Sequence, residues 1–262
     1  MDEFGKTYID YFSEIYARFI EKTEKRLENY RINGLPKNVG FYYKLLRNGF
    51  MDIAIGEIIL NKDIVKSKQY FYLVAKMQEV IFQKYDDKFD ISMDYVNTNS
   101  YGTLFMALIS DNKDLINSLS ALFGGRDKEE ADDDILGKLV GYSVKHIILK
   151  EFDEAETYVI KLQELNQKSR MRLYKGYGIV LDGIIKKNKE SVQEGLVYML
   201  ECHRKLTDDY GDTPEELLSI PALGLAKLAM NNGIEVEVDH ILAPKVMLEQ
   251  RDIQYPIVDF VD

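Results

Sequence analysis

The chain of 262 residues is long enough to bury a hydrophobic core without disulfides or metals. Its 44 acidic and 34 basic residues give a formal net charge of −10, which disfavours nucleic acid and anionic membranes as partners and favours a basic one, although solubility alone also explains an acidic surface. Cys202 has no second cysteine to pair with, no apolar stretch reaches the roughly 18 residues of a membrane span, and residues 1–12 do not resemble a signal peptide. We therefore expect a soluble, cytoplasmic protein.

Apolar residues recur at spacings of three, four and seven along nearly the whole chain, which predicts helices rather than strands. In chain order, the predicted apolar stripes are Tyr8, Phe12, Ile15 and Phe19; Tyr70, Val74, Met77 and Ile81; Tyr101, Leu104, Phe105 and Leu108; Ile135, Leu139, Tyr142 and Leu149; Leu173, Tyr177, Val180 and Ile184; and Val192, Leu196 and Met199. Residues 88–100 and 233–240 alternate enough to suggest extended structure, and we expect loops or edge pieces there.

Four segments share a weak pattern, which is the end of one helix, a short polar turn and the start of the next helix. They begin at Ile58, Ala107, Ile147 and Ile184, and a spacing of roughly 35 to 50 residues is typical of a helical hairpin with its connection. No tetratricopeptide consensus is present. The sequence therefore predicts an all-α fold: an irregular array of antiparallel helical hairpins in a single domain over residues 1–262, with tetratricopeptide-like right-handed packing as one arrangement open to it.

Residues 122–136, LFGGRDKEEADDDIL, interrupt the apolar pattern with two glycines and a dense charged run. We expect a long, exposed acidic loop at residues 124–134 rather than a domain boundary. Two interpretations are open. The loop is a flexible acidic element that covers a basic cleft in a partner, or it is a solvated linker whose last carboxylates stabilise the N-terminus of the next helix.

Residues 213–234, TPEELLSIPALGLAKLAMNNGI, predict two successive helices. Thr213 is a suitable cap with Glu216 completing a capping box, and Pro221 predicts a break at residues 218–220. The second helix has apolar and small residues on two faces, as a central helix packed on both sides would. Asn231, Asn232 and Gly233 predict its end.

No constellation of residues predicts catalysis, a cofactor or a metal site. The three histidines, His146, His203 and His240, form no HExxH motif and have no CxxC beside them. His146 and His203 extend apolar stripes, which favours core histidines with one hydrogen bond each, and Cys202 is expected to be a buried small residue. Gly176, Gly178 and Gly183 lack the following Gly-Lys-Ser/Thr of a phosphate loop and favour close helix packing instead.

The C-terminal part of the chain resembles a known family. The segments KGYGIVLDGIIKKNKESVQEGLVYMLECHRKL (residues 175–206) and LLSIPALGLAKLAMNNGIEVEVDH are similar to the C-terminal half of the immunity protein 49 family. The resemblance covers about the last 90 residues well, the middle hairpins vaguely and the first 60 hardly at all. It implies an all-helical, non-enzymatic bacterial antitoxin that binds a cognate toxin of a polymorphic toxin system.

The leading interpretation is therefore an immunity protein that neutralises a toxin, with a basic toxin domain favoured by charge. The candidate contact residues are the acidic loop and two tyrosines expected to reach the surface: Asp127, Glu129, Glu130, Asp132, Asp133, Asp134, Tyr42 and Tyr43. A helical-repeat scaffold or peptide-responsive regulator is the alternative, and a continuous polar and aromatic groove would support it. A third interpretation is an enzyme, with His146 or His203 beside a carboxylate in a deep pocket.

Overall fold

The computed structural model describes residues 3–260, and the side chains of residues 8–260. These residues form twelve α-helices and four short 3-10 helices, with one isolated bridge between His240 and Ala243 and no strand. The elements are α1 (Glu3–Asn33), α2 (Val39–Ile59), α3 (Ile64–Asp86), η1 (Met93–Tyr95), η2 (Thr98–Tyr101), α4 (Gly102–Ser110), α5 (Lys113–Leu122), α6 (Ile135–Ile148), α7 (Phe152–Asn166), η3 (Ser169–Tyr174), α8 (Lys175–Ile185), α9 (Lys189–His203), α10 (Thr207–Tyr210), η4 (Pro214–Leu217), α11 (Ile220–Asn231) and α12 (Lys245–Leu248). The all-α prediction is confirmed.

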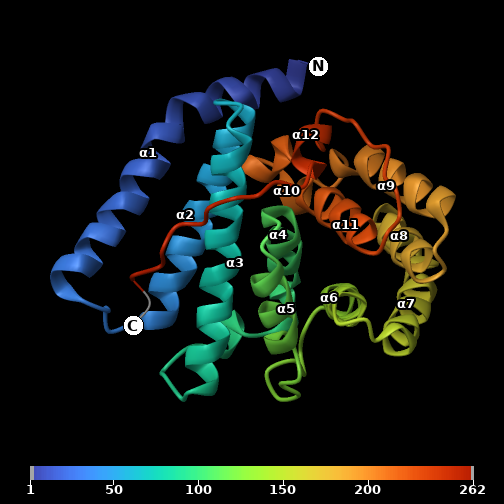
Figure 1. Cartoon of the computed structure of the whole chain (residues 1–262), viewed down its shortest axis with the longest axis horizontal. Coiled ribbons are helices and arrows are strands. Elements are labelled where there is room, and N and C mark those ends of the chain that lie inside the picture. The colour runs from blue at the N-terminus through green and yellow to red at the C-terminus, as the bar shows by residue number, and fades with distance from the viewer. Residues whose placement is uncertain (1–2, 261–262) are drawn as a thin grey trace.

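The weak sequence repeat corresponds to four helical hairpins, α2–α3, α4–α5, α6–α7 and α8–α9 (Figure 1). Each turn contains one residue with a positive φ angle, and these residues are Lys62, Asp111, Lys150 and Lys187, with φ between 55° and 67°. In three of the four turns the next residue, Asp63, Asn112 or Asn188, caps the following helix through its side chain. One left-handed residue and one cap thus reverse the chain with very few residues.

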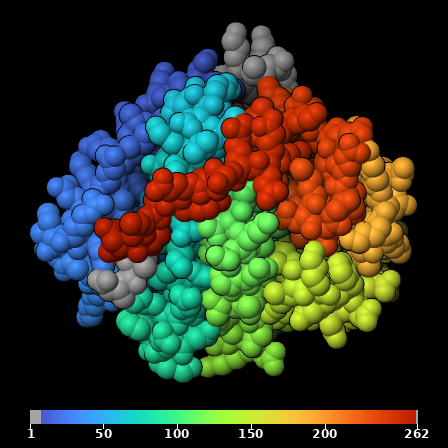
Figure 2. All heavy atoms as spheres, in the orientation of Figure 1, coloured from blue at the N-terminus to red at the C-terminus, as the bar shows by residue number. Residues whose placement is uncertain are grey.

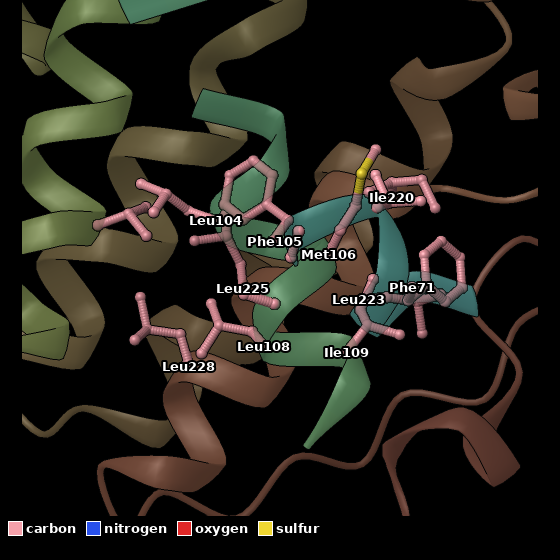
Figure 3. Close-up of a cluster of buried hydrophobic side chains, with 14 of the residues drawn as sticks. Phe71, Leu104, Phe105, Met106, Leu108, Ile109, Ile220, Leu223, Leu225 and Leu228 are labelled. Atoms are coloured by element: carbon pink, nitrogen blue, oxygen red, sulfur yellow. The ribbon is translucent and has the colours of Figure 1, made fainter. Parts of the chain in front are cut away.

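Helix α11 lies at the centre of the array and is buried on both faces, as the sequence predicts. All ten residues from Ile220 to Ala229 are buried. A Cβ atom at Gly224 would lie 2.3 Å from the Cβ of Phe105, so α11 and α4 approach more closely than any larger residue allows. Figure 3 shows Leu104, Phe105 and Leu108 of α4 facing Leu225 and Leu228 of α11.

The break before α11 is confirmed, and the predicted capping box is not. Leu218 is extended, with φ −148° and ψ 120°, and separates η4 from α11. Thr213 caps nothing, because its hydroxyl donates to the carbonyl of Tyr210 at 2.7 Å, and Glu216 accepts from the backbone N–H of Asp212 at 3.3 Å instead of from Thr213. A 3-10 turn rather than an α-helix forms there, so the spacing of the box does not apply.

The last described residues form an extended segment, residues 249–260, which we call the C-terminal strap. It crosses the surface of α3 and α2 (Figures 1 and 2). Lys68 donates to the carbonyl of Glu249 at 2.7 Å, and the hydroxyl of Tyr255 donates to the carbonyl of Ser110 at 2.6 Å. The strap therefore ties the C-terminal end of the chain to the N-terminal hairpins.

Candidate functional site

The acidic loop at residues 124–134 is joined to neighbouring residues by a set of side-chain hydrogen bonds. Its buried centre is Glu130, which is 2% exposed. The Glu130 carboxylate accepts hydrogen bonds from the backbone N–H of Arg126 at 2.9 Å and from the hydroxyl of Tyr142 at 2.8 Å. Tyr142 also accepts from the backbone N–H of Gly125 at 2.7 Å. A buried charge with two such partners fixes the loop backbone against α6.

The loop is also joined to the connection between α3 and η2. Arg126 forms a bidentate pair with Asp86, at 2.7 Å between Nη2 and Oδ2 and 3.1 Å between Nε and Oδ1. The Tyr85 hydroxyl donates to Glu129. Asp133 accepts from both the backbone N–H of Thr98, at 2.7 Å, and its hydroxyl. Figure 2 shows the two connections side by side at the lower edge of the molecule.

These two segments, residues 84–94 and 126–134, form what we call the acidic surface. Together they contain ten carboxylates and four basic side chains, so twenty residues account for six of the ten net negative charges of the chain. Two of the four basic groups are engaged within the surface, because Arg126 pairs with Asp86 and Lys84 lies 4.6 Å from the ring centroid of Phe89. The surface therefore has a strong excess of negative charge.

Two large apolar side chains are exposed in the same surface. Phe89 is 43% exposed and Met93 is 44% exposed. Aromatic residues and methionine are enriched in protein interfaces, where they fill pockets in the partner. Apolar anchors surrounded by carboxylates are suited to a partner that presents apolar pockets among basic side chains.

The structure separates the predicted contact residues into three groups. Asp127, Asp132 and Asp134 are exposed, whereas Glu129 and Asp133 are half-buried and bonded to Tyr85 and Thr98. Asp134 caps α6 by accepting from the backbone N–H of Gly137 at 3.0 Å, as the linker interpretation predicts. Glu130 is buried inside the loop and cannot contact a partner without unfolding it.

The expectation that Tyr42 and Tyr43 reach the surface is wrong. They are 7% and 0% exposed. Tyr42 stacks on Tyr30 of α1 with ring centroids 6.1 Å apart, and the rings of Tyr42 and Tyr43 lie 5.3 Å apart. Helix α1 covers this face of α2. The apolar pattern of the sequence does not indicate which helix α1 packs against.

The sequence also left Asp86, Asp87, Asp90 and Asp94 out of the candidate surface, although Asp86 and Asp87 are visible as a carboxylate pair. Nothing in the sequence places them beside residues some 40 positions later. The density of acidic residues in both connections was the one available signal.

His203 and His146, the two histidines considered as enzyme residues, differ in their burial and in their contacts. His203 is 2% exposed, its Nε2 lies 3.0 Å from the carbonyl oxygen of Glu215, and burial lowers its pKa to about 4. This matches the predicted core histidine. His146 is only partly buried, with Nδ1 2.6 Å from a carboxylate oxygen of Glu151. Its ring is nearly parallel to those of Tyr142 and Tyr158, with centroids 6.0 and 5.6 Å away.

Other predicted features concern packing. Cys202 is buried. A Cβ atom on Gly176 would lie 2.3 Å from Cγ of Met199, and one on Gly183 would lie 2.9 Å from the backbone nitrogen of Val192, so these glycines allow α8 and α9 to pack closely. Among the described residues, no group of three histidine, cysteine or acidic side chains is placed to hold a metal ion. None of the described helices combines the length and apolar character needed to cross a bilayer.

A groove of about 420 Å³ lies between the N-terminal part of α1, the C-terminal end of α2 and the segment before α12. Its lining includes His240 and the apolar side chains of Ile59, Ile241 and Val246. Ile241 is 49% exposed and Val246 is 38% exposed. The groove bears on the scaffold alternative, since an exposed apolar lining can accept a short segment of a partner.

Part of the chain matches a known family. The family model described as Immunity protein 49 matches residues 148–247, from the end of α6 into α12. The resemblance noted in the sequence is thereby confirmed. Neither the curated proteins nor the solved structures contain a match to this chain. The acidic surface lies outside the matched residues.

Proposed function

From the match of α7–α11 to the immunity protein 49 family, we propose that the protein is an antitoxin that binds a cognate bacterial toxin and neutralises it without chemistry of its own. The family match is the observation on which this proposal depends. Neutralisation is by occlusion: the folded helical body covers the toxin's active site or a surface that the toxin needs. The proposed site of action is the cytoplasm, where a toxin-producing cell must protect itself.

We place the toxin contact on the acidic surface. Its excess of carboxylates supports association with a basic toxin domain, because complementary charge raises the association rate. Its backbone is fixed by Glu130, Arg126 and Asp133, so binding costs less conformational entropy than ordering a flexible loop would. Phe89 and Met93 supply the apolar area that charge alone does not provide.

The experiment is a neutralisation assay with the toxin from the adjacent reading frame. The test variant is D87K/D127K/D132K, which reverses three exposed carboxylates of the acidic surface that form no hydrogen bond or ion pair with a described residue. The control variant is E14K/E164K/E194K, which makes the same change in net charge at exposed positions of α1, α7 and α9. We expect the control to protect cells like the wild type and the test variant to lose protection.

Three results would contradict the proposal at different points. Failure of the wild-type protein to bind the toxin would reject the antitoxin function. Equal protection by both triple variants would reject the acidic surface and keep the function. Loss of protection by both variants would show that net charge, rather than this surface, controls binding.

The groove beside Ile241 and Val246 supports a second candidate, a scaffold that binds a peptide segment. Ile241→Asp would abolish that binding and leave toxin neutralisation unchanged. An I241D variant that loses neutralisation would instead place the toxin in the groove.

A further inference from the structure

A second hollow in the molecule has charge properties opposite to those of the acidic surface. It has a volume of about 410 Å³ and lies where the α4–α5 turn, the end of α6, the end of α11 and the C-terminal strap meet. Residues of all four elements line it, among them Lys113, Lys150, Asn232 and Gln250. We call it the lysine cavity. Its size is within the range of about 300 to 1,000 Å³ that is usual for small-ligand sites.

Positive charge dominates the lysine cavity. Lys113 and Lys150 line it, and Lys113 forms no ion pair with any described residue. Among the described residues of the lining, Asp111 alone carries a carboxylate, and both of its oxygens are already occupied, one by Lys68 and the other by Lys227. The two lysines of the lining are therefore not paired with its carboxylate, which is neutralised by Lys68 and Lys227 from outside the lining.

Lys150 is held in place at the wall of the cavity. It is in the left-handed conformation with φ 64°, and its ammonium donates to Oδ1 of Asn232 at 2.8 Å. Lys187 donates to the backbone carbonyl of the same Asn232 at 2.7 Å. Burial and the charge of Lys187 lower the pKa of Lys150, which is the direction expected where positive charges gather without a counter-ion.

The remainder of the lining is apolar at the base and amide-rich at the rim. Leu108 and Leu228, which lie side by side in Figure 3, form the base together with Ile116 and Ile148. Asn117, Asn231 and Gln250 line the cavity with side-chain amides that can both donate and accept hydrogen bonds. The carboxylates of Asp114 and Asp252 line a neighbouring hollow, which shares Asp111, Lys113 and Gln250 with this one.

We propose that the lysine cavity binds a small phosphate monoester with an aromatic or apolar body, of the nucleoside monophosphate type. The phosphate lies between Lys113 and Lys150, where two ammonium groups compensate its charge. The body lies on Leu108, Ile116 and Leu228, with its polar edge toward the rim amides. This site is independent of toxin binding and goes beyond the proposed antitoxin function.

The test is calorimetric titration of the full chain at low ionic strength with adenosine monophosphate, phenyl phosphate, adenosine and inorganic phosphate. We expect both phosphate monoesters to bind, and we expect added salt to lower their affinity. We expect adenosine and inorganic phosphate to bind at least about tenfold more weakly, because each lacks one half of the recognised chemistry. Binding of neither monoester would overturn the proposal.

Two variants locate the binding. K113Q/K150Q removes both ammonium groups of the wall and should weaken the binding of adenosine monophosphate by at least about tenfold. K161Q/K168Q removes one exposed lysine of α7 and one just after it, and should leave this affinity unchanged. Asn117→Trp fills the rim of the cavity and should also abolish binding, with the folded state checked by its circular dichroism. Equal affinity of K113Q/K150Q and K161Q/K168Q, or a Met230 methyl resonance that does not shift on titration, would overturn the assignment.

Discussion

Lys68 of α3 and Lys227 of α11 are both buried and share a single carboxylate, that of Asp111 in the α4–α5 turn. Each ammonium also donates to a backbone carbonyl around the start of the strap, Lys68 to Glu249 at 2.7 Å and Lys227 to Leu248 at 3.1 Å. The triad of Asp111, Lys68 and Lys227 thus connects the second hairpin to α3, α11 and the start of the strap. Burial, with the charge of Lys227 as the second cause, lowers the pKa of Lys68 to about 8.

Replacing this carboxylate should be strongly destabilising. Asp111→Asn keeps a residue that tolerates the observed φ of 67°, but leaves two buried ammonium groups without a counter-ion. We expect the free energy of unfolding to fall by about 3 to 5 kcal/mol, measured by urea denaturation. The exposed neighbour Asp114→Asn is the control and should change it by less than about 0.5 kcal/mol. A D111N protein as stable as D114N would show that the triad has no net role in stability.

The close approach of α11 and α4 predicts opposite effects for two glycine substitutions. Gly224→Ala places a Cβ atom 2.3 Å from that of Phe105, which is fully buried, and should cost about 1 to 3 kcal/mol through overpacking. Gly102→Ala meets no atom within 4 Å at the start of α4 and should be neutral or stabilising by up to about 1 kcal/mol. Thermal unfolding of the two variants distinguishes them, and a G224A protein that matches G102A would refute this packing.

The two substitutions also show what could be predicted from the sequence. Apolar periodicity predicts α11 with two buried faces, and the repeat locates all four hairpin turns, because both depend on local chain geometry. Which helix contacts which depends on side-chain fit between distant segments. The sequence therefore did not reveal that Phe105 meets Gly224, that α1 covers Tyr42, or that Arg126 pairs with Asp86. The strap has no periodicity and left no signal.

The raised pKa values of two carboxyl groups predict that the stability of the fold depends on pH. Burial, with the charge of Glu215 as the second cause, raises the pKa of Asp52 from 3.8 to about 7, and burial with the charge of Asp209 raises that of Glu215 from 4.5 to about 7. Arg26 on α1 opposes the shift of Asp52. At these two groups the folded protein binds more protons than the unfolded chain between about pH 4 and pH 7, so their contribution to stability falls as the pH rises. The lowered pKa of His203 acts in the opposite direction and offsets part of this fall.

Asp52→Asn should remove part of this dependence. Because the amide carries no charge to desolvate, we expect the free energy of unfolding near pH 8 to increase by about 1 to 3 kcal/mol and the decline between pH 4 and 7 to become shallower. Urea denaturation at a series of pH values measures both. The exposed Asp90→Asn is the control. Parallel curves for wild type and D52N would refute the shift assigned to Asp52.

Glu130 offers a way to loosen the acidic surface without changing its exposed groups. Glu130→Ala leaves the hydroxyl of Tyr142 and the backbone N–H of Arg126 without their acceptor and should cost about 1 to 3 kcal/mol. Hydrogen exchange at residues 125–134 should accelerate more than in the control Asp132→Ala. We expect E130A to bind the toxin more weakly, since the loop must then be ordered on binding. Unchanged exchange in E130A would show that the loop is fixed by other contacts.

Whether the acidic surface contacts the toxin can be measured by hydrogen exchange in the free protein and in its complex with the toxin from the adjacent reading frame. We predict that the complex protects residues 84–94 and 126–134 and leaves the exposed faces of α7 and α9 unchanged. A complex that protects α7 and α9 and leaves both segments of the acidic surface exchanging as in the free protein would contradict it.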